Sequence, residues 1–208
     1  MKFPYKKYQN LNNFISDYFA DFTKAKNNIN IKNLEYIILA LKKAYMNKKI
    51  KIFVCGNGGS AAIANHFECD HKKILSEGTK ILNPRIISLC TNNPLITAIA
   101  NDFSYEEIFS RQLKYLARKG DILITISSSG RSKNIIRALR WSNKNNIKTI
   151  SFTGFNGGES KKIAKLNIHA SSYNYGVVEN IHHSIMNIIS QFLRQDSNNL
   201  KTIRDSYF

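Results

Sequence analysis

A glycine-rich loop at residues 55–62 is the first segment whose composition suits ligand chemistry. Its sequence is CGNGGSAA, and its glycines are Gly56, Gly58 and Gly59. Glycines let the backbone turn tightly and approach a ligand closely. Ser60 then opens a predicted helix, whose free N–H groups and positive dipole end favour an anion. Many glycine-rich turns are purely structural, so this loop alone leaves both phosphate binding and a structural turn open.

A serine-rich loop at residues 127–132 is the second such segment. Its sequence is SSSGRS, and its hydroxyls belong to Ser127, Ser128, Ser129 and Ser132. Serine hydroxyls ahead of a helix suit the several acceptor oxygens of a phosphate, although serine is also a common helix cap. Arg131 adds a charge that could face either the ligand or solvent. Two loops that are each suited to bind an anion favour a phosphate site more strongly than either loop alone.

The elements that must position these loops alternate between apolar segments and helical periodicity. Five short segments, rich in β-branched residues, are expected to be strands buried on both faces of a parallel sheet. They are Lys51–Cys55, Arg85–Cys90, Asp121–Ile126, Lys148–Thr153 and Asn167–Ala170. Helices are predicted at 6–26, 31–48, 60–74, 94–100, 105–118, 133–143, 160–165 and 177–194. This alternation predicts an α/β fold with a doubly wound five-stranded parallel sheet, whose ligands bind beyond the carboxyl ends of the strands.

Length and composition bound the class of protein. The chain has 208 residues, and we expect one domain over 1–208, with N-terminal helices at 1–48 and an α/β core at 49–196. Three scattered cysteines support neither a disulfide scaffold nor a structural zinc site. No apolar run is long enough to span a bilayer, and the N-terminus lacks a signal peptide, so a cytoplasmic protein without membrane contact is expected.

The net charge of +17 is the strongest compositional signal. It could indicate a nucleic-acid partner, an anionic substrate or compositional drift. The lysines are spread along the chain without a basic tail or an RGG run. Drift is therefore the favoured interpretation, and we expect no nucleic-acid partner.

Several motifs in a consistent order resemble the sugar isomerase (SIS) domain family, and within it the phosphoheptose isomerase group. They are CGNGGSAA followed by NHF, AND followed by F and an amphipathic helix, GDILITISSSGRS, and FTGFNGG at 152–158. The resemblance covers about residues 6–194 and implies a flavodoxin-like sheet with an N-terminal helical extension. It also implies a homotetramer with sites at subunit interfaces. The implied reaction is the aldose–ketose isomerisation of sedoheptulose 7-phosphate to D-glycero-D-manno-heptose 7-phosphate.

The resemblance also assigns roles residue by residue. Substrate would be bound by Asn57, Gly58, Gly59 and Glu179, the sugar hydroxyls by Asn101 and Asp102, and the phosphate by Ser127, Ser128, Ser129 and Ser132. His66 matches a histidine that ligates zinc in the family. The implied metal positions are His66, Asp70, Glu179 and Asn187, and the implied cofactor is zinc or another divalent ion.

Three of these positions depart from the family pattern. Asp70 stands where the family has glutamate, and Glu179 where it has glutamine. Asn187 replaces a histidine that forms the family's acid/base pair with that glutamate. The related initiator-associating proteins, which bind a replication initiator rather than catalyse, also carry asparagine there, but they lack the carboxylate.

His183 is the candidate for the lost imidazole, because the family has an apolar residue at its position. Glu179, His183 and Asn187 follow one another at i+4 spacing on one helix face, and His66 and Asp70 do so on another helix. We therefore expect Asp70, Glu179 and His183 to be catalytic. His66, Asp70, Glu179 and His183 also form a donor set that suits zinc. His71 and His182 are weaker candidates. His71 directly follows Asp70 and His182 directly precedes His183, so neither is expected to lie on the helix face that carries its neighbour.

Three functions remain open from the sequence. The first is a phosphoheptose isomerase with a rearranged acid/base set. The second is an isomerase of another phosphosugar, because phosphate loops do not specify the sugar. The third is a non-catalytic SIS protein that binds a phosphosugar or a protein partner such as a replication initiator. Asn187 favours the third function, whereas Asp70, Glu179 and His183 favour the first two.

Overall fold

A computed structural model describes residues 2–79 and 81–205 of the chain. Its centre is a five-stranded, all-parallel sheet in the order β2-β1-β3-β4-β5. The strands are β1 (Ile52–Gly56), β2 (Ile86–Ser88), β3 (Ile122–Ser127), β4 (Lys148–Thr153) and β5 (Leu166–His169). This arrangement confirms the predicted fold class. β2 is shorter than predicted, because its pairing with β1 ends at Ser88.

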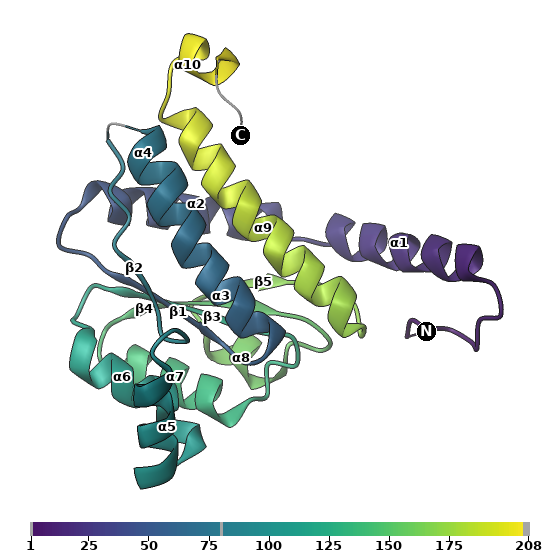
Figure 1. Ribbon diagram of the computed structural model, residues 1–208, viewed down its shortest axis with the longest axis horizontal. Helices are drawn as coiled ribbons and strands as arrows, with labels where there is room; N and C mark the ends of the chain where they lie inside the picture. Colours follow the sequence, from purple (N-terminus) through teal and green to yellow (C-terminus); the bar gives the residue numbers. More distant parts are fainter. Residues whose placement is uncertain (1, 80, 206–208) are drawn as a thin grey trace.

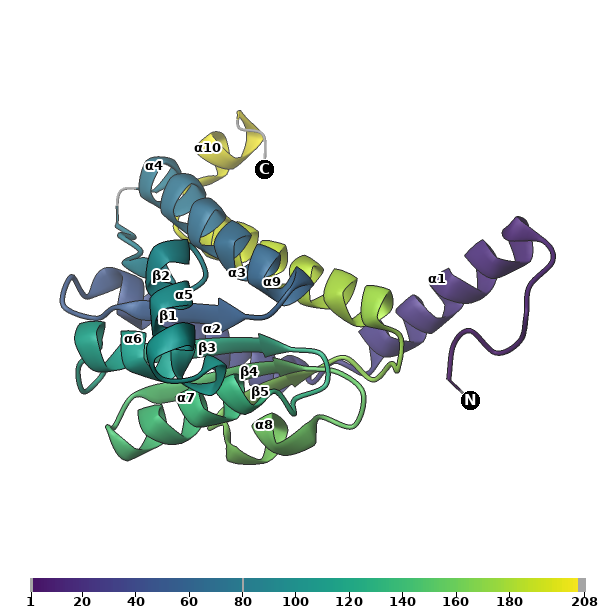
Figure 2. The same ribbon diagram turned by 60° about the horizontal axis from the view of Figure 1, so that its bottom comes forward.

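Helices cover both faces of the sheet (Figures 1 and 2). Ile52 and Val54 of β1 belong to one core, which they share with α2 (Ile31–Met46), α3 (Gly59–Asp70) and α9 (Tyr175–Asp196). Phe53 and Cys55 alternate with them and belong to the other core. The second core is closed by α5 (Asn93–Asp102), α6 (Ile108–Leu116) and α7 (Lys133–Lys144), and the 3₁₀-helix Tyr105–Glu107 lies between α5 and α6 in the chain. α8 (Gly158–Ile163) packs on α7 and β4 on this side. Burial on both faces explains why the strands lack a polar alternation.

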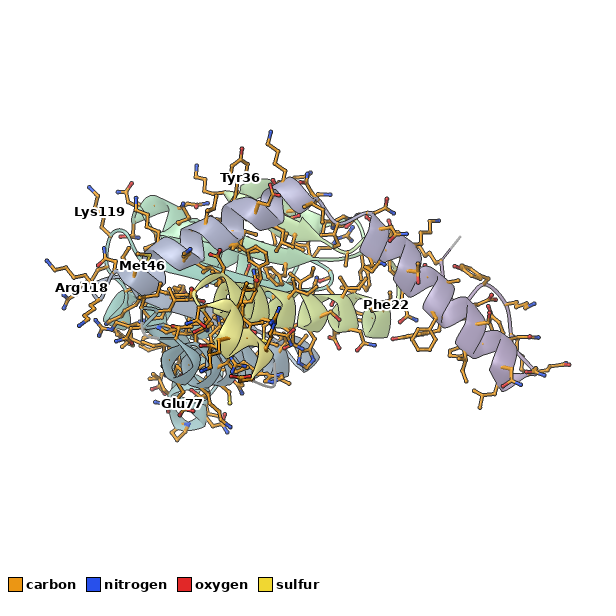
Figure 3. The ribbon with its side chains drawn as sticks, turned by 90° about the horizontal axis from the view of Figure 1, so that it is seen from above. Phe22, Tyr36, Met46, Glu77, Arg118 and Lys119 are labelled. Carbon is orange, nitrogen blue, oxygen red and sulfur yellow. The ribbon has the colours of Figure 1, made fainter. Side chains whose placement is uncertain are left out.

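The N-terminal helix α1 (Leu11–Asn27) projects away from the sheet, as Figures 1 and 2 show. It starts five residues later than predicted, where the Asn10 side chain accepts hydrogen bonds from the N–H groups of Asn12 and Asn13. Seen from above, Tyr36 and Met46 project outward from α2, and both are exposed (Figure 3). No described helix is both long enough and apolar enough to cross a membrane.

α3 and α9 run side by side in the same direction on one face of the sheet (Figure 1). Gly59 at the start of α3 lies against Glu179, and His66 further along α3 contacts His183. α3 is followed by a π-helical turn (His71–Leu75) and by α4 (Ser76–Gly78), where Gly78 lies against Arg194. The predicted helix 60–74 is therefore two elements, with the change of helix type directly after Asp70. A short helix, α10 (Leu200–Arg204), follows α9.

Candidate active site

A cavity of about 300 Å³ opens at the carboxyl ends of β1 and β3. These strands are neighbours, with Gly56 paired to Ile126, so the loops that follow them meet. The chain leaves β1 toward β2 and β3 toward β4, which makes this point the topological switch of the sheet. The lining residues are Asn57, Gly58, Gly59, Ser60, Ile126, Ser127, Ser128, Ser129, Ser132, Tyr175 and Glu179. The two loops selected from the sequence thus form one pocket.

The glycine turn is shaped by Gly58, whose φ of 55° lies in the left-handed region that favours glycine. The turn opens α3, so the N-terminus of that helix points at the cavity. The side chain of Asn57 is occupied within the protein. It forms a reciprocal amide pair with Asn134 at 2.9 and 3.0 Å and accepts a hydrogen bond from the hydroxyl of Tyr105 at 3.1 Å. Asn57 therefore holds the turn in place with its side chain.

The four serines of the second loop divide into two pairs. The hydroxyls of Ser127 and Ser129 accept hydrogen bonds from the N–H groups of Gly130 and Arg131, at 3.2 Å each, and so shape the turn. The Ser128 hydroxyl is buried and has no partner in the described part of the chain. Ser132 precedes α7, but its side chain makes no capping hydrogen bond.

A buried hydroxyl without a partner is costly, and a ligand oxygen would remove that cost. Ser128 and Ser132 thus offer two hydroxyls, and the start of α7 offers free N–H groups and a positive dipole end. This arrangement suits a phosphate group. Which of the four serines contact the ligand remains a prediction.

Glu179, on α9, also lines the cavity. Its carboxylate lies so close to Gly59 that a Cβ added there would be 2.5 Å from Oε2. Burial raises the pKa of the Glu179 carboxyl above its ordinary value. A carboxylate with a raised pKa is a stronger base, so Glu179 is suited to accept a proton from a bound ligand.

A chain of three side chains lies one helical turn from Glu179. His66 Nε2 is 3.0 Å from Asp70 Oδ1, and His66 Nδ1 is 2.5 Å from His183 Nε2. An ionised carboxylate only accepts, so His66 donates from Nε2 to Asp70 and is left with an acceptor at Nδ1. His183 then donates from Nε2, and its Nδ1 carries a free lone pair. The polarity set by Asp70 thus leaves His183 as a base at the end of the chain.

The electrostatics of His183 agree with this assignment. Burial is the main cause that lowers the pKa of His183, and the nearby His66 lowers the pKa further, against a smaller opposing effect of Asp70. The imidazole is therefore neutral near pH 7 and able to accept a proton. His66, Asp70 and His183 do not line the cavity themselves.

The same side chains are the donors that the resemblance implies for a divalent ion. Both ring nitrogens of His66 already have protein partners, so its lone pair points at His183 and not at a shared centre. Within residues 2–79 and 81–205, no group of three or more His, Cys, Asp or Glu side chains is arranged to hold a metal ion. This arrangement of His66, Asp70, Glu179 and His183 therefore does not fit zinc.

Three other predicted residues lie outside the cavity. Asn101 and Asp102 are exposed at the end of α5, where the Asn101 amide donates to the Asp102 carboxylate at 3.0 Å. Asn187 is half-buried on α9, one turn beyond His183. Neither the sugar-binding role of the first two nor a metal-binding role of Asn187 is tested by this geometry, and these roles remain predictions.

Sequence reasoning missed three residues of the site. Tyr175, the first residue of α9, lines the cavity, and Asn134 and Tyr105 hold Asn57. Asn134 lies two residues beyond the serine loop, so its position was a usable signal. Tyr105 and Tyr175 stand in segments without a recognisable motif, and only the folding of distant segments brings them to the site.

Comparison with known proteins agrees with the fold. Residues 17–154 match the family model described as SIS domain. A probable phosphoheptose isomerase of Thermoplasma acidophilum is 36% identical over 172 residues, which cover 83% of this chain and 93% of that protein. A phosphoheptose isomerase of Aliarcobacter butzleri is 39% identical, covering 69% of this chain and 77% of its own length.

A solved structure gives the same result in three dimensions. The phosphoheptose isomerase of Neisseria gonorrhoeae superposes with a TM-score of 0.80 at 26% identity, covering 89% of this chain and 100% of that chain. The chain described here therefore belongs to the SIS domain family, within its phosphoheptose isomerase group.

Proposed function

We propose that this chain catalyses the aldose–ketose isomerisation of sedoheptulose 7-phosphate to D-glycero-D-manno-heptose 7-phosphate. Membership of the phosphoheptose isomerase group confirms the expectation of an isomerase enzyme that acts on phosphosugars. The observation that carries the proposal is a single cavity lined both by the Ser128 hydroxyl, which has no partner among the described residues, and by the Glu179 carboxylate, whose pKa is raised. The first group suits a phosphate and the second suits proton transfer.

The serine loop would anchor the substrate by its phosphate. Ser128 and Ser132 donate hydrogen bonds to phosphate oxygens, and the free N–H groups at the start of α7 add to them. The sugar chain would then extend through the cavity to Glu179, because that residue lines the same cavity. Fixing the substrate at one end places its carbonyl end near the carboxylate.

The reaction moves one proton between two neighbouring carbons. Glu179 takes the proton from C1 of the ketose, which leaves an enediolate with its negative charge on O2. The His183 Nδ1, which lies beside the cavity and reaches the sugar oxygens through a bound water molecule, accepts the O1 proton and passes it to O2, with its ring held in orientation by His66 and Asp70. Glu179 then returns its proton to C2, which leaves the aldehyde at C1. Zinc or another divalent ion, expected from the resemblance, stays a prediction that metal analysis of the purified protein tests.

A homotetramer with sites at subunit interfaces is part of the proposal. α1 projects from the body and carries Leu11, Ile15 and Phe19 at i+4 spacing, all exposed. An apolar stripe on a projecting helix favours burial against another protein surface. Assembly of this kind would also allow Asn101 and Asp102 of one subunit to approach the cavity of another.

A non-catalytic phosphosugar-binding protein is the second candidate, favoured by Asn187 in place of the family's histidine. It predicts binding without turnover. An isomerase of a different phosphosugar would instead turn over another substrate, since nothing in the serine loop selects a seven-carbon sugar.

The test measures binding and turnover separately. Purified protein is titrated with sedoheptulose 7-phosphate by calorimetry and then assayed for heptose 7-phosphate by NMR, in buffer with chelator and in buffer with zinc. We expect turnover that falls at least 100-fold in Glu179→Gln, while binding persists. Binding without turnover in either buffer would favour the non-catalytic candidate. If sedoheptulose 7-phosphate does not bind, it is not the substrate of this protein.

A further inference from the structure

A second cavity, of about 430 Å³, lies at the same edge of the sheet. It adjoins the candidate active site, because Ser129 and Tyr175 line both. Its other lining residues are Lys2, Arg131, Phe155, Asn156 and Tyr173. The isomerisation described above uses none of these five side chains.

The walls of this second cavity are held by backbone contacts. A Cβ on Gly130 would lie 2.0 Å from the carbonyl oxygen of Gly157, so the loops after β3 and β4 touch directly. The Ser160 N–H donates to the Gly130 carbonyl at 3.0 Å, which joins the same loops. Phe155 adopts a φ of 52°, unusual for a bulky residue, and its N–H donates to the Ser172 carbonyl at 2.9 Å. Strained, hydrogen-bonded backbone of this kind is enriched at ligand sites.

Two cations line this cavity without carboxylate partners. Further along α7, Lys133, Arg137 and Arg140 each form an ion pair with a glutamate. Arg131 forms no ion pair within the described residues, although it precedes the same helix. Lys2 likewise has no carboxylate partner there, and its Nζ lies 4.5 Å from the ring centroid of Tyr173. Two uncompensated positive charges around one cavity favour an anionic ligand.

Three aromatic rings form the rest of the surface. The rings of Phe155 and Tyr173 are nearly parallel, at 8° with centroids 5.8 Å apart. Tyr175 meets Phe155 edge-on, at 77° and 4.7 Å. Tyr173 and Tyr175 are 47% and 61% exposed. The Tyr173 ring becomes available for stacking when Lys2 moves from it to a bound phosphate, and the Tyr175 ring has no stacked partner among the described residues. Exposed aromatic faces beside cations match a ligand that combines a flat ring with a phosphate.

We propose that this cavity is a nucleotide-binding site. The base would stack on the exposed ring of Tyr173 or Tyr175, and the phosphates would pair with Arg131 and Lys2. A nucleotide bound there would abut a phosphosugar in the first cavity at Ser129. The site is separate from the proposed isomerisation, which requires only the first cavity.

The test is calorimetric titration of the full chain with ADP, adenosine and inorganic phosphate at 0.15 M salt. We expect saturable ADP binding at least tenfold tighter than that of adenosine or phosphate. Arg131→Gln and Tyr173→Ala should each weaken ADP binding tenfold or more. Arg140→Gln is the matched control, because Arg140 is an exposed arginine of α7 outside the cavity, and it should bind ADP as the wild type does.

Three results would overturn the proposal: no saturable ADP binding at millimolar concentration, unchanged ADP binding in both cavity variants, or phosphate or adenosine binding as tightly as ADP. Thermal melts of each variant confirm that it is folded. Sedoheptulose 7-phosphate is titrated into Tyr173→Ala as well, where we expect binding within twofold of wild type. Failure of the nucleotide site and failure of the isomerase proposal therefore give different results.

Discussion

The individual polar residues of the cavity differ in whether their side chains already form hydrogen bonds within the protein. The amide of Asn57 is fully engaged with Asn134 and Tyr105, so its contribution is to hold the turn. The Ser128 hydroxyl is buried without a partner in the described part of the chain. A buried polar group without a hydrogen-bond partner is the kind of group best suited to bind a ligand.

Ser128→Ala tests that distinction. A hydrogen bond to a charged group contributes about 1.5–3 kcal/mol, so we expect the KM for the phosphosugar to rise at least tenfold. The free energy of unfolding should change little, because the hydroxyl has no partner to lose. Ser142→Ala is the control, since Ser142 is equally buried and unpaired but lies on α7 outside the cavity. Equal KM values in the two variants would contradict a phosphate contact of Ser128.

A buried histidine on the same helix makes stability depend on pH. His182 donates from Nε2 to the Thr153 carbonyl, and burial is the main cause that lowers its pKa to about 4. The unfolded chain binds a proton at this residue below about pH 6.5, whereas the folded chain does not until about pH 4. The contribution of His182 to the free energy of unfolding is therefore fully present above about pH 6.5 and is lost as the pH falls toward 4.

Urea unfolding at pH 7 and pH 5 measures this effect. We expect His182 to account for a loss on the order of 2 kcal/mol between these pH values. In His182→Gln, which keeps a donor for Thr153, that part of the loss should disappear. An identical pH slope in the variant would show that His182 titrates normally in the folded protein.

At the scale of elements, the parallel pair α3 and α9 brings the acid/base groups together. Gly59 meets Glu179, and His66 meets His183 one to two turns further along. Four residues of helix rise about 6 Å, which separates the carboxylate in the cavity from the imidazole chain beside it. The relative position of the two helices, and not any one loop, therefore sets the distance between Glu179 and His183.

Gly59→Ala tests this dependence. The new methyl group would displace the Glu179 carboxylate, whose flexible end can move at little cost in stability. Replacing glycine by alanine in the middle of a helix stabilises by about 0.5–1 kcal/mol, and the gain at Gly59 should be smaller because this residue is the first of α3. We expect an unchanged or slightly raised melting temperature together with a loss of kcat of at least tenfold. Full activity would show that the carboxylate is not needed where the structure places it.

Much of this arrangement was accessible from the sequence. The five strands, their parallel pairing and the meeting of the two loops all follow from apolar segments with polar residues at their ends. Asp70, His66 and His183 were grouped by i+4 spacing and by the resemblance, and the structure places them in contact. These features can be predicted locally because the number of residues per turn of a helix, or the alternation along a strand, determines which residues share a face.

Other features required the folded chain. The π-helical turn after Asp70 arises where α3 packs along α9, and no local signal in HKKIL predicts it. The engagement of both His66 nitrogens, which argues against the predicted metal set, depends on a residue 117 positions away. Contacts between distant segments of this kind depend on packing, which a single sequence does not reveal.

Two features of the whole molecule, the charge of +17 and the projecting α1, bear on its encounter with substrates and on its assembly with other copies of the chain. The ligand groups of the first cavity are serines, glycines and helix N-termini, so the lysines lie mostly outside it. A positive surface speeds the encounter with anionic substrates, and this effect weakens with salt. The expectation that the chain has no nucleic-acid partner stays a prediction.

The assembly expected from α1 is measured by light scattering after gel filtration. We expect a tetramer for the wild type and a smaller species for the triple variant Leu11→Ser, Ile15→Ser, Phe19→Ser, because the exposed apolar stripe would be lost. Helix content by circular dichroism serves as the folding control. A wild-type monomer, or an unchanged tetramer in the triple variant, would contradict a role of this stripe in assembly.

In the proposed isomerase, His183 supplies the imidazole that Asn187 lacks. The decisive measurement is kcat for sedoheptulose 7-phosphate in the wild type, in His183→Leu and in Asn187→Ala, with and without zinc. We expect turnover by the wild type, a loss of kcat of at least 100-fold in His183→Leu with little change in substrate binding, and near wild-type turnover in Asn187→Ala. Wild-type turnover that survives in His183→Leu would contradict the claim.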